Sequence, residues 1–151
     1  MVWSLAALAA LWFVLLLVSP FLPVPVSAAI YAIGSYICHQ RPERSFWLDG
    51  VQLPVCARCI GIYAGVVAGS GLAPFIGLVR WPRTAIILST FPALVSLLVE
   101  WAGLAYPSNG VRAATGAVAG IVVAAVVLAT IDYERCARPR PIAPNRPPTP
   151  I

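Results

Sequence analysis

The chain has 151 residues, of which 60% are hydrophobic, and its mean hydropathy is +0.88. This composition is too apolar for a soluble domain of the same size, so it excludes that class and indicates an integral membrane protein. The net charge of +5 comes from ten arginines. In a soluble protein such a charge would suggest nucleic acid, whereas here it favours the anionic headgroups of the lipid bilayer as partner and no nucleic acid.

The first predicted element is an apolar helix over residues 2–18, just long enough to span a bilayer. Pro20, Pro23 and Pro25 are expected to stop any helix, because each lacks a backbone donor and clashes with the preceding turn. Residues 26–28 also resemble a signal-peptidase site. No basic side chain precedes the apolar run, so retention of the segment is the favoured interpretation and cleavage the alternative.

Residues 28–37 are predicted to form a short helix that Ser27 caps. The segment is too short to cross a bilayer, so we expect it to lie in the interface or to pack against the bundle as a half-helix. It delivers Cys38 and His39 to a polar loop that spans residues 38–59.

Three further spans are predicted at about residues 61–79, 84–105 and 111–131. Glycines recur four residues apart in two of them, so each row lines one helix face and lets another backbone approach closely. The rows are Gly61, Gly65 and Gly69, and Gly116 and Gly120. The predicted fold class is an all-α integral membrane bundle of four spans, with the short interfacial half-helix and a Cys/His-rich outer loop.

The domain organisation predicted from these elements is a polytopic membrane domain over residues 1–131 and a Pro/Arg-rich cytoplasmic tail over residues 132–151. The tail should be disordered or extended. Arginine bias predicts the orientation, because the short turn after the second span and the tail hold six arginines close to membrane ends. Both termini are therefore expected in the cytoplasm, with the Cys/His loop outside a multi-pass protein of the cell inner (plasma) membrane.

Three blocks of sequence carry a resemblance to a known family. They are C-H-Q-R-P-E-R-S-F (38–46), L-P-V-C-A-R-C-I-G-I-Y-A-G (53–65) and S-N-G-V-R-A-A-T-G-A-V-A-G (108–120). With these blocks the chain resembles the uncharacterised prokaryotic membrane-protein family called domain of unknown function 2085. The resemblance implies a small polytopic membrane protein and brings no established reaction.

The polar loop has the residue types of a metal site. Cys56 and Cys59 have the spacing at which two thiolates turn toward one ion, and Cys38 and His39 complete a Cys3His set suited to tetrahedral zinc. Adjacent side chains diverge in a regular helix or strand, so Cys38 and His39 can share an ion only from a bent loop. If His39 does not ligate, Glu43 or a water takes the fourth position and the site is open, as catalytic zinc sites are.

Thiol–disulfide chemistry is the alternative for the same cysteines. Cys56 and Cys59 precede a helix start, where the macrodipole and Arg58 would lower a thiol pKa and make Cys56 the attacking and Cys59 the resolving thiol. A relay normally needs two cysteine pairs, and Cys136 is predicted on the other side of the membrane. A plain structural disulfide also remains open. Attachment of c-type haem is excluded, because Ile60 and not histidine follows Cys59.

Charged residues near the loop suggest an anion site. Guanidinium groups match phosphate or carboxylate oxygens, so the predicted outer arginines and an asparagine at the facing turn form a mouth for an anionic or lipid-phosphate ligand. The residues are Arg41, Arg44, Arg58, Arg112 and Asn109. The alternative is that each arginine reaches to headgroups or pairs with Glu43 or Asp49.

Glu100 is expected about 7–8 Å inside its span, where an unpaired carboxylate is costly. It should therefore face the bundle and meet Arg112 or the metal site. With Glu43 it is also the candidate base of a zinc-dependent hydrolase acting on a lipid-linked or anionic substrate. The favoured hypothesis is a binding or transport-related protein, because no recognisable catalytic constellation accompanies the ligands; whether the chain is an enzyme stays open. Ser45, Thr115 and Tyr63 are candidates by position alone.

Overall fold

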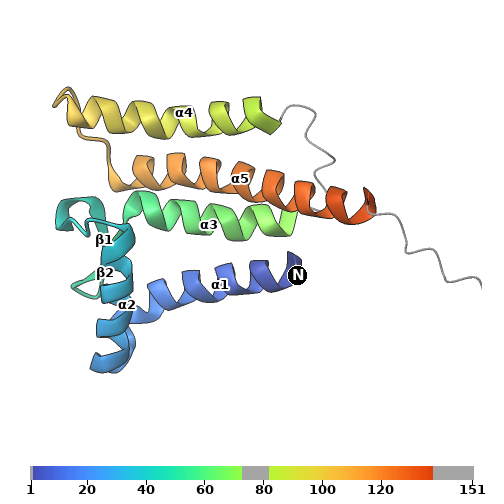
Figure 1. Ribbon diagram of the computed structural model, residues 1–151. Helices are drawn as coiled ribbons and strands as arrows, with labels where there is room; N and C mark the ends of the chain where they lie inside the picture. Colours follow the sequence, from blue (N-terminus) through green and yellow to red (C-terminus); the bar gives the residue numbers. More distant parts are fainter. Residues whose placement is uncertain (1, 73–81, 138–151) are drawn as a thin grey trace, which may run out of the picture.

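A computed structural model describes residues 2–72 and 82–137 of the chain (Figure 1). In chain order the elements are α1 (Val2–Val18), the 3-10 turn η1 (Ser19–Phe21), α2 (Val24–Ile37), the 3-10 turn η2 (Pro42–Arg44), β1 (Ser45–Leu48), β2 (Val51–Cys56), α3 (Ala57–Leu72), α4 (Pro82–Trp101) and α5 (Asn109–Ala137).

Four helices lie side by side in the spatial order α1, α3, α5, α4 (Figure 1). The helix α2 crosses one end of this group, next to the strands β1 and β2. The start of α1 and the end of α5 lie at the opposite end. The polar segment between α2 and α3 is therefore gathered at a single end of the bundle.

Three segments of the described chain are long and apolar enough to cross a membrane, namely Trp3–Phe21, Pro82–Trp101 and Asn109–Ile131. The helix α3 is shorter, and the rest of the span predicted at 61–79 lies outside the described residues. Four spans therefore stay a prediction. The helix α5 continues past the predicted end at Ile131 to Ala137, and the remainder of the predicted tail falls outside the described residues.

The start predicted for the half-helix is wrong. The helix α2 begins at Val24 rather than Ala28, and its N-cap is Pro23 rather than Ser27. The carbonyl of Pro23 accepts hydrogen bonds from the backbone N–H groups of Val26 and Ser27. Pro25 fits in this first turn because backbone N–H groups there have no partner within the helix, so a residue without one loses nothing.

The all-α class is wrong for the polar loop, which contains an antiparallel hairpin. Asp49 and Gly50 both have positive φ, 48° and 77°, and connect the pair Leu48 and Val51. Asp-Gly with two positive φ values is the type I′ turn that matches the twist of two strands. The loop also ends earlier than predicted, because α3 begins at Ala57 and takes Cys59 into its first turn.

The helices α3 and α5 pack with their backbones in close contact, which confirms the packing role predicted for the glycine rows. A Cβ atom at Gly61 or Gly65 would collide with the backbone of Ala113 or Ala117, and one at Gly116 would collide with the backbone carbonyl of Arg58. Glycine is therefore required on both helices, and the contact fixes the start of α3 against the start of α5.

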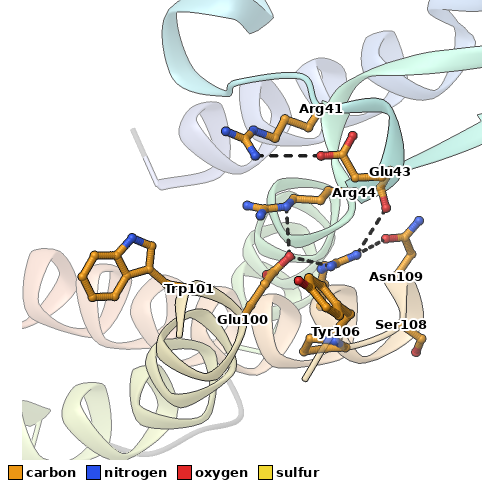
Figure 2. Close-up of a pocket in the computed structure, with 10 residues that line it drawn as sticks. Arg41, Glu43, Arg44, Glu100, Trp101, Tyr106, Ser108 and Asn109 are labelled. Carbon is orange, nitrogen blue, oxygen red and sulfur yellow. Dashed lines mark hydrogen bonds and ion pairs between the residues drawn. The ribbon is translucent and has the colours of Figure 1, made fainter. Parts of the chain in front are cut away.

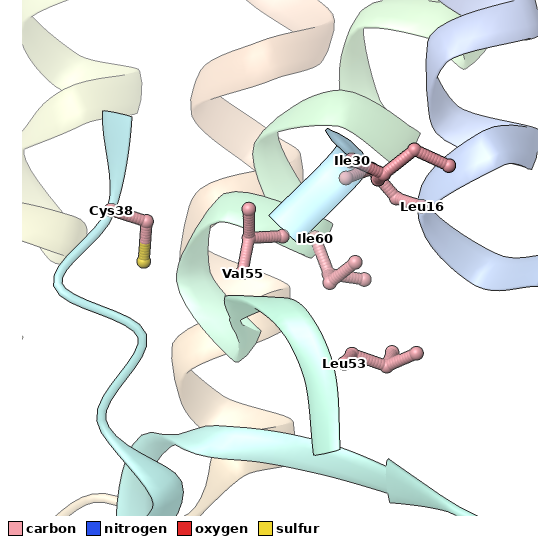
Figure 3. Close-up of a cluster of buried hydrophobic side chains, with 6 residues drawn as sticks. All are labelled: Leu16, Ile30, Cys38, Leu53, Val55 and Ile60. Carbon is pink, nitrogen blue, oxygen red and sulfur yellow. The ribbon is translucent and has the colours of Figure 1, made fainter. Parts of the chain in front are cut away.

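An apolar cluster supports the hairpin end of the bundle (Figure 3). It joins α1, α2, β2 and α3 through the buried side chains of Leu16, Ile30, Cys38, Leu53, Val55 and Ile60. Trp12 and Tyr63 pack beside it edge to face, with ring centroids 6.5 Å apart. Cys38 is thus held in the same apolar layer that fixes α2 and β2 on the helices.

Two glycines of α3 provide a matched test of this packing. We expect Gly65→Ala to lower the free energy of unfolding by about 1–3 kcal/mol, because the added methyl group meets the backbone of Ala117. Gly71→Ala is the control, since a Cβ there has no neighbour within 4 Å, and its helix propensity should make it neutral or slightly stabilising. Thermal unfolding in detergent measures both, and equal unfolding midpoints would contradict the packing argument.

Candidate functional site

The turn that follows α2 bends the chain at Gln40. Cys38 has extended backbone angles at the end of α2, and Gln40 has a φ of 49°. The side-chain amide of Gln40 donates hydrogen bonds of 2.8 Å to the carbonyls of Tyr31 and Pro54, and the amide of Gln52 donates one of 2.6 Å to the carbonyl of Gln40. Gln40 therefore makes the bend that a metal site with the adjacent Cys38 and His39 requires. The side chains of Gln40 and Gln52 hold this bend in place, and neither residue was identified from the sequence.

Three cysteines converge beside this bend. The Sγ atoms of Cys38, Cys56 and Cys59 all lie within 4.8 Å of one another, and those of Cys56 and Cys59 are 3.6 Å apart. Sulfurs bound to one tetrahedral zinc ion at about 2.3 Å would lie about 3.8 Å from each other. A disulfide would need about 2.05 Å. The spacing therefore suits a shared metal ion better than a sulfur–sulfur bond.

Cys38 is the buried member of this cluster and its Sγ accepts a hydrogen bond of 3.2 Å from the backbone N–H of Cys56. The thiol groups of Cys56 and Cys59, together with backbone N–H donors, hold the pKa of the Cys38 thiol well below its usual range. Its thiolate form is favoured because these donors stabilise the negative charge. Thiolates are the form that binds metal, so this lowering of the pKa favours the ligating form of Cys38.

A cavity of about 330 Å³, here called the cysteine pocket, opens beside the three sulfurs. It is lined by Ile37, Cys38, His39, Gln40, Arg41, Arg44, Cys56, Arg58, Cys59, Ile62 and Leu97. His39 is exposed at this pocket and is not among the residues whose ligand atoms converge. The structure thus brings three of the four predicted ligands together and leaves His39 beside them.

Next to the cysteine pocket, one carboxylate holds three arginines. Oε1 of Glu100 lies 2.6 Å from a terminal nitrogen of Arg112 and 2.9 Å from Nε of Arg44. Oε2 of Glu100 lies 3.6 Å from a terminal nitrogen of Arg58. That nitrogen also donates a hydrogen bond to Oγ of Ser96, another residue that the sequence did not single out. The pair expected between Glu100 and Arg112 therefore forms, with two further guanidinium groups around it.

This ion cluster is buried to a degree that makes it energetically important. The side chain of Glu100 is 1% exposed and that of Arg112 is 6% exposed. Removing one partner from a buried pair leaves an unpaired charge in a medium of low dielectric constant, which costs several kcal/mol. The four charges come from η2, α3, α4 and α5, so the cluster ties four elements of the chain to one point.

Asn109 and Ser45 hold Arg112 against the hairpin. Oδ1 of Asn109 accepts a hydrogen bond of 2.7 Å from Arg112, and the side-chain amide of Asn109 donates one of 2.9 Å to the carbonyl of Ser45. The buried hydroxyl of Ser45 donates to the carbonyl of Arg41. The roles of Asn109 and Ser45 seen in the structure are contacts within the chain, and Thr115 likewise bonds to its own helix, at Val111.

A second and larger cavity, the arginine pocket, has a volume of about 690 Å³ and lies over Glu100 (Figure 2). It is lined by Arg41, Glu43, Arg44, Glu100, Trp101, Tyr106, Pro107, Ser108, Asn109 and Arg112. Glu43 is exposed and pairs loosely with Arg41 at 3.9 Å. Arg41 and Arg44 line both pockets, so the two cavities are neighbours. Trp101 and Tyr106 were not identified from the sequence.

Comparison with known proteins identifies relatives of this chain. Residues 38–126, which include all three blocks, match the model of a family described as "Predicted membrane protein (DUF2085)". The chain is 37% identical over 110 residues to an uncharacterized protein of Methanocaldococcus jannaschii, covering 68% of this chain and 69% of that protein. It is 35% identical over 92 residues to an uncharacterized protein of Methanothermobacter thermautotrophicus, covering 59% of this chain and 82% of that protein. No solved structure matches it.

The two glutamates of the site should differ sharply in their effect on stability. We expect Glu100→Gln to lower the free energy of unfolding by about 3 kcal/mol or more, because it leaves three partly buried guanidinium groups without their counter-charge. Glu43→Gln, at an exposed pair, should cost about 0–1 kcal/mol. Thermal unfolding in detergent measures the difference, and similar losses in both variants would show that the buried cluster does not stabilise the fold.

Proposed function

The chain belongs to the DUF2085 family of predicted membrane proteins, and we propose that it binds a zinc ion through Cys38, Cys56 and Cys59 beside an arginine-lined site for an anion. The observation that carries the proposal is the convergence of the three Sγ atoms within 4.8 Å. Sulfur-rich ligand sets favour zinc among the divalent metals. Structural zinc sites use four protein ligands, whereas catalytic sites use three and keep the fourth position for a water or a substrate.

The fourth coordination position is proposed to be open to an exchangeable ligand. His39 lines the cysteine pocket, but its exposed side chain would have to bring a ring nitrogen to the three sulfurs to complete a closed Cys3His site. The same pocket is lined by Arg44 and Arg58, whose guanidinium groups suit an anionic ligand. Zinc bound there would act as a Lewis acid toward that ligand, while the two arginines would bind and orient it.

A binding or transport-related role is favoured over hydrolysis by the surroundings of Glu100. Its carboxylate contacts three guanidinium groups, so it serves to position Arg44, Arg58 and Arg112 rather than to take a proton from water. Glu43, the other candidate base, is exposed and lines the arginine pocket but not the cysteine pocket. Neither carboxylate is placed beside the three sulfurs.

Thiol–disulfide oxidoreduction is the second candidate, because Cys56 and Cys59 have Sγ atoms only 3.6 Å apart at the first turn of α3. A small side-chain rotation would bring them to bonding distance. The third thiol at this end, Cys38, has no second partner among the described residues with which to form the additional pair that a relay needs. This candidate is therefore ranked below metal binding.

The proposed orientation places the hairpin and both pockets outside the plasma membrane, with both termini in the cytoplasm. Arginine bias supports it, and the start of α1 and the end of α5 lie together at the end opposite the hairpin (Figure 1). The proposed partners of this surface are anionic headgroups and an anionic ligand, and not nucleic acid.

Metal content tests the zinc proposal directly. We expect about one zinc per chain in the protein purified in detergent without added metal, and loss of that zinc in Cys56→Ser. Cys136→Ser is the matched control, because Cys136 lies near the far end of α5. Plasma mass spectrometry gives the metal content, with free thiols counted alongside. Absence of metal, together with oxidised Cys56 and Cys59, would reject zinc and support the redox candidate.

Replacement of His39 separates an open from a closed site. We expect His39→Ala to retain its zinc, since the side chain lies outside the sulfur cluster. Substitution by cobalt and visible absorption spectroscopy should show three thiolate ligands in both proteins. A large loss of metal or a changed cobalt spectrum in His39→Ala would instead establish His39 as the fourth ligand.

A further inference from the structure

The ion cluster around Glu100 carries an excess of positive charge. Arg44, Arg58 and Arg112 contribute three positive charges, and Glu100 contributes one negative charge, which leaves two positive charges. The side chains of these arginines are 30%, 17% and 6% exposed. Like charges gathered around one buried carboxylate repel one another, so the arrangement favours a further anion.

Among the described residues, no other acidic group offsets this excess, although Glu43 lines the arginine pocket. The chain has five acidic residues. Glu43 pairs with Arg41, and Asp49 lies in the exposed hairpin turn. Asp132 and Glu134 follow Arg112 by more than five turns of α5, about 30 Å along the helix. The described acidic residues therefore leave the two positive charges of the cluster uncompensated.

The arginine pocket provides a place for a compensating anion. Arg41, Arg44 and Arg112 line it, and Nε of the buried Arg112 has no hydrogen-bond partner among the described residues. Its volume of about 690 Å³ accommodates more than an inorganic ion. Guanidinium groups that line a cavity, one of them with an N–H that has no partner, are suited to bind the oxygens of a phosphate group.

Aromatic side chains place this pocket at the level of lipid headgroups. Trp101, which ends the apolar helix α4, and Tyr106 in the following turn both line the pocket and are 86% and 78% exposed. Tryptophan and tyrosine are enriched where a membrane meets water. Leu97 and Leu98, on the preceding turn, are also exposed, as expected of a surface that contacts lipid chains.

We propose that the arginine pocket binds the phosphate group of a monoester, in its dianionic form, carried by a membrane lipid. A phosphate monoester has a second pKa of about 6 and so carries nearly two negative charges at neutral pH, which matches the two excess positive charges of the cluster. A phosphate diester carries only one. Arg44 and Arg112 line the arginine pocket, while Arg58 lines the cysteine pocket and shares Glu100 with them. The inference deepens the anion site of the proposed function and rests on it, but it does not depend on the zinc ion.

Lipids that differ only in phosphate charge test the proposal. The full-length protein is placed in neutral phosphatidylcholine nanodiscs at pH 8 with phosphatidic acid, a monoester, or phosphatidylglycerol, a diester, and bound lipid is measured by native mass spectrometry. We expect phosphatidic acid to bind about tenfold more tightly, the effect of about one charge-assisted hydrogen bond. Arg44→Gln should abolish this preference. Arg83→Gln, which removes the same charge near the start of α4, should retain it.

Arg41→Gln is the second variant if Arg44→Gln does not fold, because Arg41 is 55% exposed and contacts only the exposed Glu43 among described charged groups. It should weaken binding of phosphatidic acid more than Arg83→Gln does. Equal binding of both lipids, lost in Arg44→Gln, would overturn the monoester inference and leave the anion site intact. If neither Arg44→Gln nor Arg41→Gln changed the binding of phosphatidic acid, the monoester inference and the anion site would both be overturned, whatever the zinc content. Displacement of phosphatidic acid by equimolar glycerol phosphate would support the phosphate chemistry and assign the site to a soluble ester.

Discussion

The functional end of this protein depends on one buried carboxylate. Glu100 is the acidic group that η2, α3 and α5 all contact, through Arg44, Arg58 and Arg112. The 3-10 turn η2 is too short to be stable by itself, so this contact fixes the hairpin segment over the helices together with the apolar cluster and the hydrogen bond from Asn109 to Ser45. In a medium of low dielectric constant an ion pair is strong and an unpaired ion is costly, which makes the position of Glu100 a strict constraint.

Close contact between α3 and α5 is what allows that carboxylate to gather arginines from different helices. Gly61 and Gly116 bring the N-terminal parts of α3 and α5 together, and these parts also carry Arg58 and Arg112. The residue that follows Arg58 is Cys59, so the same helix contact also places one sulfur of the three-cysteine cluster. The packing of α3 against α5 therefore also positions the arginines and cysteines of the site. The three sequence blocks of the family, residues 38–46, 53–65 and 108–120, meet at this point.

The helical part of the fold could be predicted from sequence because long apolar runs and glycine spacing are local signals. The hairpin was also predictable, since Asp49-Gly50 is a strong turn signal. Because this signal lies within a Cys/His-rich loop, the loop was instead interpreted as an irregular metal-binding segment. The convergence of Cys38 with Cys56 and Cys59 depends on Gln40, whose positive φ and two long-range hydrogen bonds leave no periodic trace in the sequence. Trp101 and Tyr106 line the arginine pocket because the end of α4 lies beside the start of α5. Such a contact between helix ends belongs to the tertiary structure and leaves no local pattern in the sequence.

Arg44 connects the two halves of the proposed site. It lines the cysteine pocket and the arginine pocket, and its Nε is bound to Glu100. An anion beside the sulfurs and a phosphate in the larger pocket would therefore both lie close to the same guanidinium. Because that group carries a single positive charge, neutralising it from one pocket weakens the attraction it offers in the other. Binding of the two proposed ligands would thus be coupled, and by thermodynamic linkage the effect of each on the other would be equal.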